Sequence, residues 1–427
     1  MLTPRPGKGG GETGAGTAEG RHTLALLGSL CLFLSALEYL IPKPFPFMRI
    51  GLANLPLLLA LDLFSPADFF LLAFLKTIGQ GILTGTLVSY VFLFSLAGTI
   101  SSAVLMYALH RAVGPRRSGY AGISCAGAML SNGVQLFLAR FFVFGAGLGF
   151  LVPPFLASGF ASGIALGIFC EVFCGRSRWY GLHAATGKIR QPAGETRRTA
   201  PEIRGTVPET RGTSAGERCL RRRQRWNELF GSTELFIAGL IMMLFLVFNP
   251  SPLLRVPQFL FFCFLAWCSG KRNNPLVTAL VMASIVFFNL LAPHGKILAA
   301  LGPLRITGGS LLSGFGKALT LEGLVMLSGA CVKTDLKLPG RLGALLGESF
   351  RLLELMRGWK MTIRRGHIIE GIDRLMLELD AAAGTEAASS AANTAAGNTP
   401  KRKFRALLPL AGMLLLAGLP LLFLHYT

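Results

Sequence analysis

The chain has 427 residues, of which 52% are hydrophobic and only 15% are charged, and its formal net charge is +21. This composition is too apolar for a soluble domain of this size, and the 32 phenylalanines and 52 glycines fit helices packed within a membrane. The basic residues cluster between apolar stretches, as in cytoplasmic loops of membrane proteins. The charge therefore indicates orientation in a membrane, and we expect no nucleic acid partner.

The first part of the chain predicts a bundle of six membrane helices. Residues 1–21 are polar and rich in glycine, and we expect them to be disordered. A domain over residues 22–174 follows, divided at about 20 apolar residues per span. The second of its helices is short, which indicates a tilted or partly re-entrant segment. The predicted helices lie near residues 22–40, 52–64, 68–85, 88–109, 121–144 and 149–174.

Basic residues define the predicted topology. They follow the fourth and sixth helices and fill a linker over residues 175–232, which we expect to be cytoplasmic and loosely structured. With a cytoplasmic N-terminus, all three groups fall inside, so we predict a multi-pass protein of the inner membrane. The connection at residues 41–47 then lies outside. Its alternating prolines stiffen it, and it is either a lid over a site or a rigid connector.

The second part of the chain predicts another helical membrane domain, over residues 233–380. Charges and leucines alternate at helical spacing within residues 341–379, which indicates amphipathic cytoplasmic helices. A low-complexity linker at 381–404 then leads to a final transmembrane helix at 405–424. The predicted fold class is therefore an all-α polytopic membrane protein. The predicted spans of this domain lie near 233–249, 256–270, 275–292 and 308–332.

Polar residues inside the first domain mark a candidate binding site. The run from Met48 to Pro56, MRIGLANLP, places a cation, a glycine, an amide and a proline in an apolar segment. Such groups are expensive in hydrocarbon and persist where they line a cavity or pack inside a bundle. On the predicted topology the polar groups lie at the midplane or in the outer half, and they suggest a pocket that opens outward. The candidate substrate-binding residues are Glu38, Arg49, Asn54, Lys76, Gln80, Asn132, Gln135 and Arg140.

Each of these side chains also has a purely structural interpretation. Asn54 and Asn132 fit hydrogen bonds that join neighbouring helices, which are at least as common as ligand contacts. Lys76 fits an ion pair with Glu38 or a side chain that extends toward the interface. Arg140 lies near a helix end, where snorkelling to the outer interface is expected. The convergence of several polar groups is stronger evidence than any one of them.

Sequence motifs for catalysis are missing. The five aspartates form no DDxxD cluster, which a prenyl synthase needs to hold Mg²⁺ and a diphosphate. The segment Gly314–Ala318 has the wrong spacing for a phosphate-binding loop. The eight cysteines are mostly scattered within apolar segments and fit buried small hydrophobes. We therefore expect no enzymatic activity, no cofactor and no metal, and any ATP hydrolysis must come from another chain.

Six segments of the first domain carry a resemblance to a known family. They are EYLIP at 38–42, RIGLAN at 49–54, SLAG at 95–98, GISCAGA at 122–128, NGVQ at 132–135 and PFLASG at 154–159. In this order they resemble the Gx transporter family, labelled heptaprenyl diphosphate synthase component I. That family is related to the substrate-binding (S) components of energy-coupling factor (ECF) transporters. The resemblance implies a six-helix bundle that binds a small molecule from outside.

Two positions depart from the family pattern. Ser131 stands where the family usually has His, which alters the pocket if that His contributes to it. Lys76 replaces what is commonly Arg, so the charge is kept and the bidentate fork is lost. S components dock on a T component through small residues of their first helix. The resemblance therefore makes Ala25 and Ser29, four residues apart, candidates for docking.

The segment LRITGGSLL at 304–312 and the helix after it are similar to ECF T components. In that family, long cytoplasmic helices with Ala-Arg-Gly-like motifs bind the ATPases. Arg357 and Arg365, each followed by glycine but not preceded by alanine, are the corresponding docking candidates. The similarity implies a membrane block that contacts ATPase subunits.

The prediction for function is uptake of a small organic solute, with ATP hydrolysis supplied in trans by ECF-type ATPase subunits. Arg49, Lys76 and Arg140 outnumber Glu38, which favours an anionic or zwitterionic ligand. Two alternatives stay open. One is a non-catalytic membrane subunit associated with heptaprenyl diphosphate synthase, and the other is a structural membrane scaffold.

Overall fold

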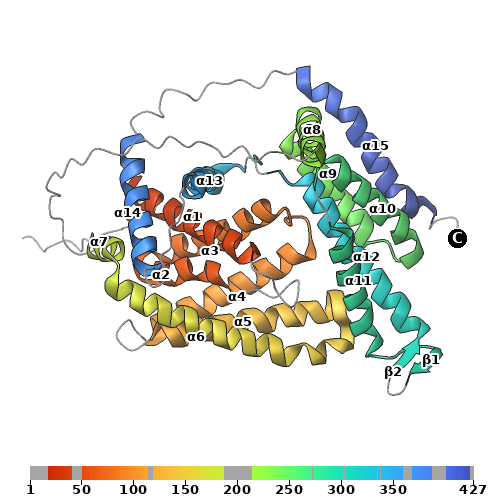
Figure 1. Ribbon diagram of the computed structural model, residues 1–427, viewed down its shortest axis with the longest axis horizontal. Coiled ribbons are helices and arrows are strands. Elements are labelled where there is room, and N and C mark those ends of the chain that lie inside the picture. The colour runs from red at the N-terminus through yellow and green to blue at the C-terminus, as the bar shows by residue number, and fades with distance from the viewer. Residues whose placement is uncertain are drawn as a thin grey trace, which may run out of the picture.

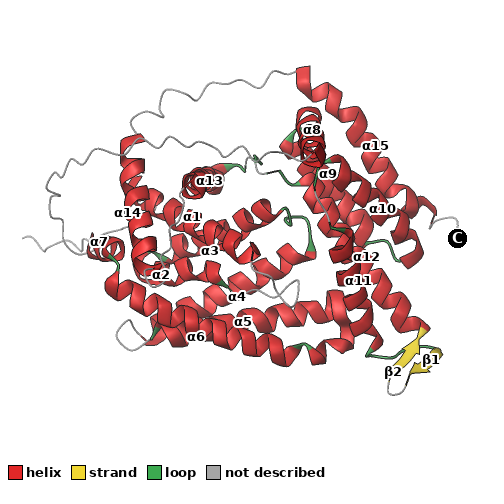
Figure 2. Cartoon of the chain, in the orientation of Figure 1, coloured by secondary structure: helices red, strands yellow, loops and turns green. Residues whose placement is uncertain are grey.

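The computed structural model describes residues 18–40, 51–113, 119–186, 214–271, 274–301, 304–333, 335–336, 338–358, 368–386 and 401–423. Over these residues the protein is an all-α polytopic membrane protein, as Figures 1 and 2 show, with one short β-hairpin. Six of the described helices are long and apolar enough to cross a membrane. The fold class predicted from the sequence is confirmed. Residues 18–21, which were expected to be disordered, begin helix α1. The rest of the expected N-terminal disorder, the connection at 41–47 and most of the 381–404 linker lie outside the described residues.

The N-terminal half forms a bundle whose helices correspond to the six predicted from the sequence. Its fifth helix is continued by a π-helix, η2, and a 3₁₀ helix, η3, before the sixth begins. The elements are α1 (Ala18–Leu40), η1 (Leu52–Asn54), α2 (Leu55–Leu63), α3 (Pro66–Thr84), α4 (Tyr90–Val113), α5 (Tyr120–Ala139), η2 (Arg140–Phe144), η3 (Gly145–Phe150), α6 (Val152–Arg176) and α7 (Arg178–Thr186).

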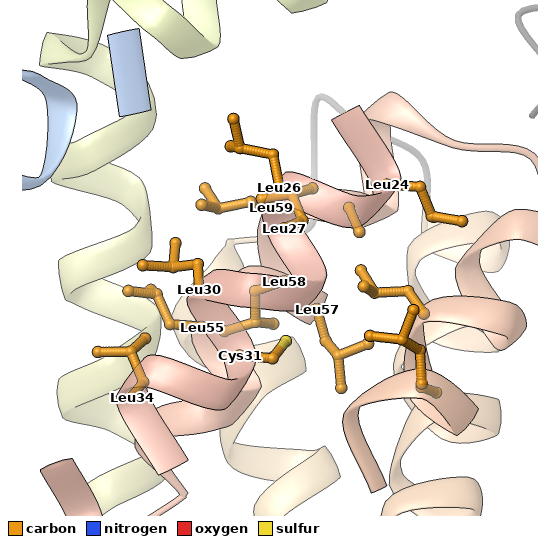
Figure 3. Close-up of a cluster of buried hydrophobic side chains, with 14 of the residues drawn as sticks. Leu24, Leu26, Leu27, Leu30, Cys31, Leu34, Leu55, Leu57, Leu58 and Leu59 are labelled. Carbon is orange, nitrogen blue, oxygen red and sulfur yellow. The ribbon is translucent and has the colours of Figure 1, made fainter. Parts of the chain in front are cut away.

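Helix α2 is a core helix and not a span of its own. Its nine residues rise only about 14 Å, far less than a hydrocarbon core of about 30 Å. Every residue from Leu55 to Leu61 is buried. Other helices cover this segment on all sides, and its residues are accordingly apolar on all sides. Figure 3 shows leucines of α2 interleaved with Leu24, Leu27 and Leu30 of α1. This leucine core joins α2 to α1.

The described part of the C-terminal half contains eight helices and the hairpin. Two helices, α7 and α8, fall within residues 175–232, so the expectation that this linker is loosely structured is wrong for those stretches. The hairpin was not predicted. The elements are α8 (Ser214–Leu229), α9 (Ser232–Val247), α10 (Pro252–Cys268), α11 (Pro275–Leu290), β1 (Ile297–Leu301), β2 (Leu304–Thr307), α12 (Gly308–Cys331), α13 (Gly340–Gly358), α14 (Ile368–Glu386) and α15 (Lys401–Phe423).

Three of the predicted spans in this half are short. Helices α9, α10 and α11 have 16, 17 and 16 residues, about 24–26 Å of helix, which is less than the thickness of a hydrocarbon core. Helix α8 is joined to α9 with a bend of 90°, so the basic helix α8 lies across the start of α9. This arrangement places a row of arginines beside the membrane block.

Helices α13 and α14 belong to the C-terminal half but pack on the N-terminal bundle. Figure 1 shows both, in blue, against the red and orange helices α1 and α3. The leucine core that contains Leu24 also contains Leu345 and Leu352 of α13 and Leu375 of α14. The two halves therefore share one continuous hydrophobic core, and neither presents this face to lipid.

Helix α14 also binds the start of α7. The Asp373 carboxylate accepts hydrogen bonds from the backbone N–H groups of Arg178 and Trp179, at 3.2 and 3.0 Å, and from the Ser177 hydroxyl. The first N–H groups of a helix have no acceptor within the helix. Ser177 itself caps the helix by accepting from the N–H of Tyr180 at 3.0 Å. A carboxylate from α14 thus completes the N-terminus of α7.

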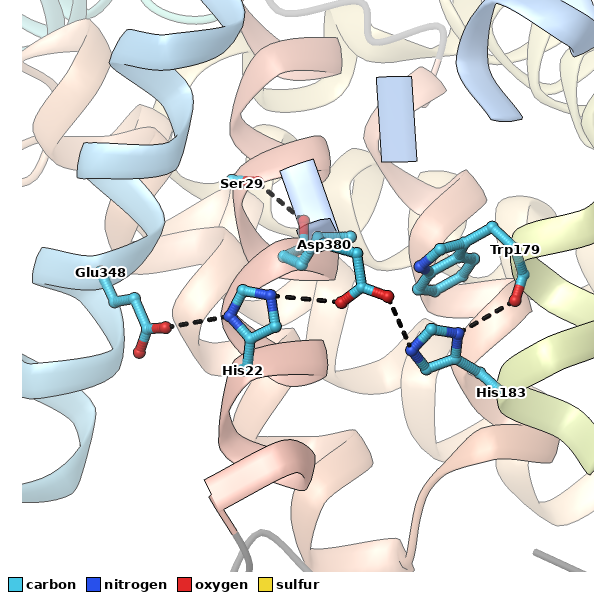
Figure 4. A network of polar contacts seen from close by, with 7 residues as sticks. His22, Ser29, Trp179, His183, Glu348 and Asp380 are labelled. Atoms are coloured by element: carbon cyan, nitrogen blue, oxygen red, sulfur yellow. Dashed lines mark hydrogen bonds and ion pairs between the residues drawn. The ribbon is translucent and has the colours of Figure 1, made fainter. Parts of the chain in front are cut away.

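A chain of ionisable side chains lies beside this cap, as Figure 4 shows. Asp380 of α14 lies 3.3 Å from His22 of α1 and 3.4 Å from His183 of α7. The other nitrogen of His22 lies 3.3 Å from Glu348 of α13. The rings of His183 and the fully buried Trp179 stack at 4.5 Å. Four helices from the two halves therefore meet in one polar cluster.

A second junction joins the two halves at the far end of α5. The carboxamide of Asn289, on α11, donates to the Val143 carbonyl of η2 at 2.9 Å. Lys317 of α12 donates to the oxygen of the same carboxamide at 3.1 Å. A Cβ on Gly147 would lie 1.7 Å from the Phe288 carbonyl oxygen, so only glycine permits this approach. The π-helix is thereby attached to the C-terminal half.

The two sets of helices run in different directions. Helices α4, α5 and α6 lie side by side across the lower part of Figure 1, whereas α12 and α15 run obliquely to them. A Cβ on Gly85, after α3, would lie 3.7 Å from the Lys271 ammonium, after α10. The sequence predicts that Gly85 lies outside and that the basic loop after α10, with Lys271, lies in the cytoplasm. Groups this close cannot lie on opposite sides of a hydrocarbon core about 30 Å thick, so these two predicted placements do not agree with each other.

Candidate functional site

Six of the eight candidate substrate-binding residues line one pocket inside the N-terminal bundle. It lies between η1 and helices α1, α3, α4, α5 and α6. The cavity volume, taken as the space open to the centre of a water-sized sphere, is about 40 Å³. One water needs about 10–15 Å³ on the same measure. The pocket therefore accommodates a very small solute or a few waters in this state. The six residues are Glu38, Asn54, Lys76, Gln80, Asn132 and Gln135.

Glu38 forms the end of the pocket at α1. Its Oε2 accepts hydrogen bonds from the backbone N–H groups of Gly51 and Leu52, at 3.2 and 3.1 Å. Gly51 has a φ of +85°, a left-handed conformation that L side chains rarely adopt, and this turn aims both N–H groups at the carboxylate. The side chain of Glu38 is only 4% exposed. The glycine of the opening motif thus shapes a small anion-holding turn around Glu38.

Lys76 brings a buried cation to the same pocket from the middle of α3. Its side chain is 4% exposed and donates a hydrogen bond to the Oδ1 of Asn54. The alternative that Lys76 extends to the interface does not agree with this placement. The contact links α3 to η1, so Asn54 serves as a link between elements and as part of the pocket wall at once.

Asn132 and Gln135 form the opposite wall. Asn132 donates to the Phe155 carbonyl of α6 at 3.0 Å, and Gln135 donates to the Ser131 hydroxyl at 3.0 Å. A Cβ on Gly159 would lie 2.1 Å from the Nδ2 of Asn132, so this glycine makes room for the amide. Asn132 therefore both joins α5 to α6 by a hydrogen bond and lines the pocket.

Hydroxyl groups of α4, α5 and α6 complete the lining and were not predicted from the sequence. Ser95, Thr99 and Ser102 of α4 lie at i, i+4 and i+7, so their helical spacing places them on one face. The Ser102 hydroxyl is buried and has no hydrogen-bond partner among the described residues. Ser124 and Ser162 add hydroxyls from α5 and α6. Each of these three helices thus adds hydroxyl groups to a wall that also contains the apolar side chains of Met106 and Leu166.

Two candidates are not placed in the pocket. Arg140 begins the π-helix η2 with an exposed side chain and does not line the pocket, as its snorkelling alternative expects. Arg49 lies outside the described residues, together with the predicted lid or connector at 41–47. Within the described part of the chain, no group of three or more His, Cys, Asp or Glu side chains is arranged to hold a metal ion.

The small-residue face of α1 is covered by the chain's own helix α13. Ala25 and Ser29 are fully buried, and the Ala25 carbonyl accepts a hydrogen bond from the Ser349 hydroxyl at 3.0 Å. A Cβ on Gly28, between them, would lie 2.7 Å from that hydroxyl. Arg357 ends α13 with a side chain that is not described, and Arg365 lies outside the described residues. The predicted docking face of α1 is therefore occupied within the same chain.

Comparison with known proteins identifies the N-terminal bundle. Residues 27–173 match the model of the family described as heptaprenyl diphosphate synthase component I, and residues 235–334 match a domain of unknown function, DUF8519. Searches of curated proteins and of solved structures found no match. The resemblance of the second half to ECF T components thus rests on the sequence motif alone. The segment that matches the heptaprenyl diphosphate synthase component I family, residues 27–173, contains every pocket residue named above.

Proposed function

We propose that this protein takes up a small polar solute across the inner membrane, with ATP hydrolysis supplied by separate ATPase subunits. The observation that carries the proposal is the pocket, where a carboxylate, an ammonium and four carboxamides converge between membrane helices. Ionisable groups inside a membrane are expensive and are found mainly where they bind a substrate, an ion or one another. The chain itself supplies binding and coupling in this proposal and no catalysis.

The chemistry of the lining defines the class of solute. Glu38 offers a carboxylate, Lys76 an ammonium, and Ser102 a buried hydroxyl without a partner among the described residues. A zwitterionic or anionic organic molecule with few heavy atoms matches such a set, because each of its polar ends finds a buried counterpart. A prenyl chain does not match it, because an apolar tail would leave these polar groups unpaired.

The packing of α13 on α1 supports coupling to another chain. Helices α13 and α14 touch the bundle through the Gly28 approach, the Asp373 cap and the histidine cluster. A subunit that moves these two helices therefore moves α1 and α7. With the N-terminus in the cytoplasm, α13 and α14 lie on the side where ATP is available. These contacts favour transport over a passive scaffold.

The proposal is tested first by finding the solute. The protein is purified in mild detergent and denatured, and the released small molecules are measured by mass spectrometry. We expect one polar solute near one equivalent in the wild type and a loss of at least tenfold in Lys76→Met. Arg140→Gln is the matched control, because Arg140 is exposed and outside the pocket. Equal solute in all three proteins, or none in the wild type, contradicts a solute pocket.

Co-purification distinguishes transport from the two alternatives, which are association with a prenyl synthase and a structural scaffold. ATPase subunits bound to the protein, with ATP-dependent uptake of the identified solute into proteoliposomes, support transport. A soluble prenyl synthase bound in their place supports the alternative that the name of the matching family suggests. Binding of neither, with no uptake, favours the structural scaffold.

A further inference from the structure

Two histidines of the cluster in Figure 4 each have an acceptor at both ring nitrogens. The Nδ1 of His22 lies 3.3 Å from a carboxylate oxygen of Glu348, and its Nε2 lies 3.3 Å from the Oδ1 of Asp380. The Nε2 of His183 lies 3.4 Å from the Oδ2 of the same aspartate, and its Nδ1 lies 2.9 Å from the Trp179 carbonyl oxygen. Three of these four contacts join the N-terminal bundle to α13 and α14.

The four contacts require more protons than two neutral imidazole rings carry. A neutral imidazole has one N–H donor and one lone pair, and only the imidazolium ion donates from both nitrogens. Carboxylate and carbonyl oxygens are acceptors, so a ring nitrogen without a proton would point its lone pair at another lone pair. Two neutral rings satisfy two of the four contacts, whereas two imidazolium rings satisfy all four. An imidazole is a stronger base than a carboxyl group, so the two additional protons reside on the rings.

Partial burial of the cluster makes this mismatch costly. The four ionisable side chains are 20–32% exposed, and the Nε2 of His22 is buried from solvent. The Trp179 ring, which is fully buried, stacks on the ring of His183 and covers that side of it. Water therefore does not replace a missing donor at every nitrogen. An unprotonated ring leaves an acceptor of the cluster without its hydrogen, and this weakens the contact between the helices.

The other charges on the surrounding helices are directed elsewhere. Asp373, two turns before Asp380 on α14, accepts from the N-terminus of α7. On α2, Asp62 accepts from the Tyr180 hydroxyl and lies 3.1 Å from the Nε2 of His110. On α3, Lys76 donates to Asn54 and Asp68 accepts from Ser65. Further charged residues of α1, α7, α13 and α14 have exposed side chains; they are Arg21, Arg178, Arg351, Glu354, Glu370 and Arg374.

We propose that this cluster is a proton-sensitive latch, which holds α13 and α14 on α1 and α7 when His22 and His183 are both protonated and loosens when the rings lose their protons. In separated helices an imidazole releases its proton at about pH 6.5, whereas the latched arrangement keeps it to higher pH. The contribution of the protons to the latched state is therefore fully present below about pH 6.5 and is lost as the pH rises above it. Asp380 and Glu348 stay ionised over this range.

Amide hydrogen exchange of the full-length protein in detergent, between about pH 6 and about pH 9, measures the latch. The intrinsic exchange rate itself rises with pH, so each rate is divided by that of an unstructured peptide at the same pH. The resulting protection is followed in two reporting segments, residues 178–186 of α7 and residues 368–386 of α14. Residues 123–139 of α5, which contribute nothing to the cluster, are the reference segment.

Two variants remove the proton-dependent contacts by different routes. A double variant, His22→Gln with His183→Gln, removes both titrating rings. Asp380→Asn keeps the rings but replaces the carboxylate with an amide that both donates and accepts, so neutral rings satisfy it. His294→Gln is the matched control, because His294 contacts Ala292 and Ser310 beside the hairpin. Asp380 is partly exposed, so its variant decides the matter if the double variant fails to fold.

In the wild type we expect the protection of both reporting segments to fall roughly tenfold from about pH 6 to about pH 9, which corresponds to one proton held one pH unit more tightly. The reference segment should keep its protection. The fall should disappear in the double variant and in Asp380→Asn, and it should remain in His294→Gln.

Three results would overturn the latch. The first is protection that does not depend on pH in the wild type, and the second is an equal fall in the reporting and reference segments. The third is a fall that persists in the double variant or in Asp380→Asn, which would assign the titration to another group. His110 is the nearest such group on the page of contacts to α7, because it lies beside Asp62, which binds Tyr180.

Discussion

Replacing Asp373 with alanine should loosen the contact between the two halves of the chain at α7. The substitution removes a carboxylate that accepts from two first-turn N–H groups and the Ser177 hydroxyl, at a position only 9% exposed. A hydrogen bond to a charged group contributes about 1.5–3 kcal/mol, and loss of a helix cap costs about 0.5–2 kcal/mol. Because Ser177 still caps the helix, we expect a net loss of about 3 kcal/mol. That is roughly a hundredfold increase in local opening of α7.

Amide hydrogen exchange of the peptide covering residues 178–186 measures this opening directly. Asp373→Asn keeps the shape and one accepting oxygen but removes the charge, so we expect a loss of about 1–2 kcal/mol. Arg374→Ala, on the next residue, is the control. It removes only an exposed ion pair with Glu378 and should cost less than about 0.5 kcal/mol. Exchange in α7 that rises no more in Asp373→Ala than in Arg374→Ala would refute the cap.

Two further substitutions test the packing around the pocket and at the second junction. Gly159→Ala should displace the Asn132 amide, destabilise the protein by about 1–2 kcal/mol and lower the amount of retained solute. Gly133→Ala, with nothing within 4 Å of its Cβ, should change neither the melting temperature nor the solute, and equal behaviour of the two variants contradicts the packing. Asn289→Ala should cost about 1–2 kcal/mol, since it removes two hydrogen bonds to backbone carbonyls and the acceptor of Lys317. Adding Lys317→Met to it should cost less than the sum of the single changes, and thermal unfolding that finds strict additivity argues against the link.

The membrane helices and most of the pocket could be predicted from the sequence for a simple physical reason. Spans need long apolar runs, so a glutamate, lysine or carboxamide within such a run stands out at once. Lys76 and Asn132 were found in this way. The serine and threonine face of α4 was missed because hydroxyls are common in membrane helices, although its i, i+4, i+7 spacing was readable. Arg140 was predicted to line the pocket but does not. The depth of a residue along a helix does not determine the direction of its side chain.

Other features depend on contacts between segments far apart in the sequence. No distinctive composition marks the π-helix η2 in the sequence. In the structure it is bound by Asn289, almost 150 residues away along the chain. The occupation of the α1 face by α13 joins residues more than 300 positions apart. Small residues recur in any membrane helix, so the sequence indicated a docking face without naming what covers it. Only the folded chain identifies α13 as its occupant.

The covered face of α1 has a consequence for how copies of this protein behave in a cell. A helix that binds its partner within one polypeptide meets it at an effective concentration that is set by the connecting chain and does not depend on how much protein is present. A separate bundle of the same kind must therefore compete for α13 with a bundle in the same polypeptide. Each α13 serves the bundle made with it, and the ratio of the two halves is one to one from the moment of synthesis. Mixed assemblies that share interchangeable bundles are thereby disfavoured without any additional recognition device.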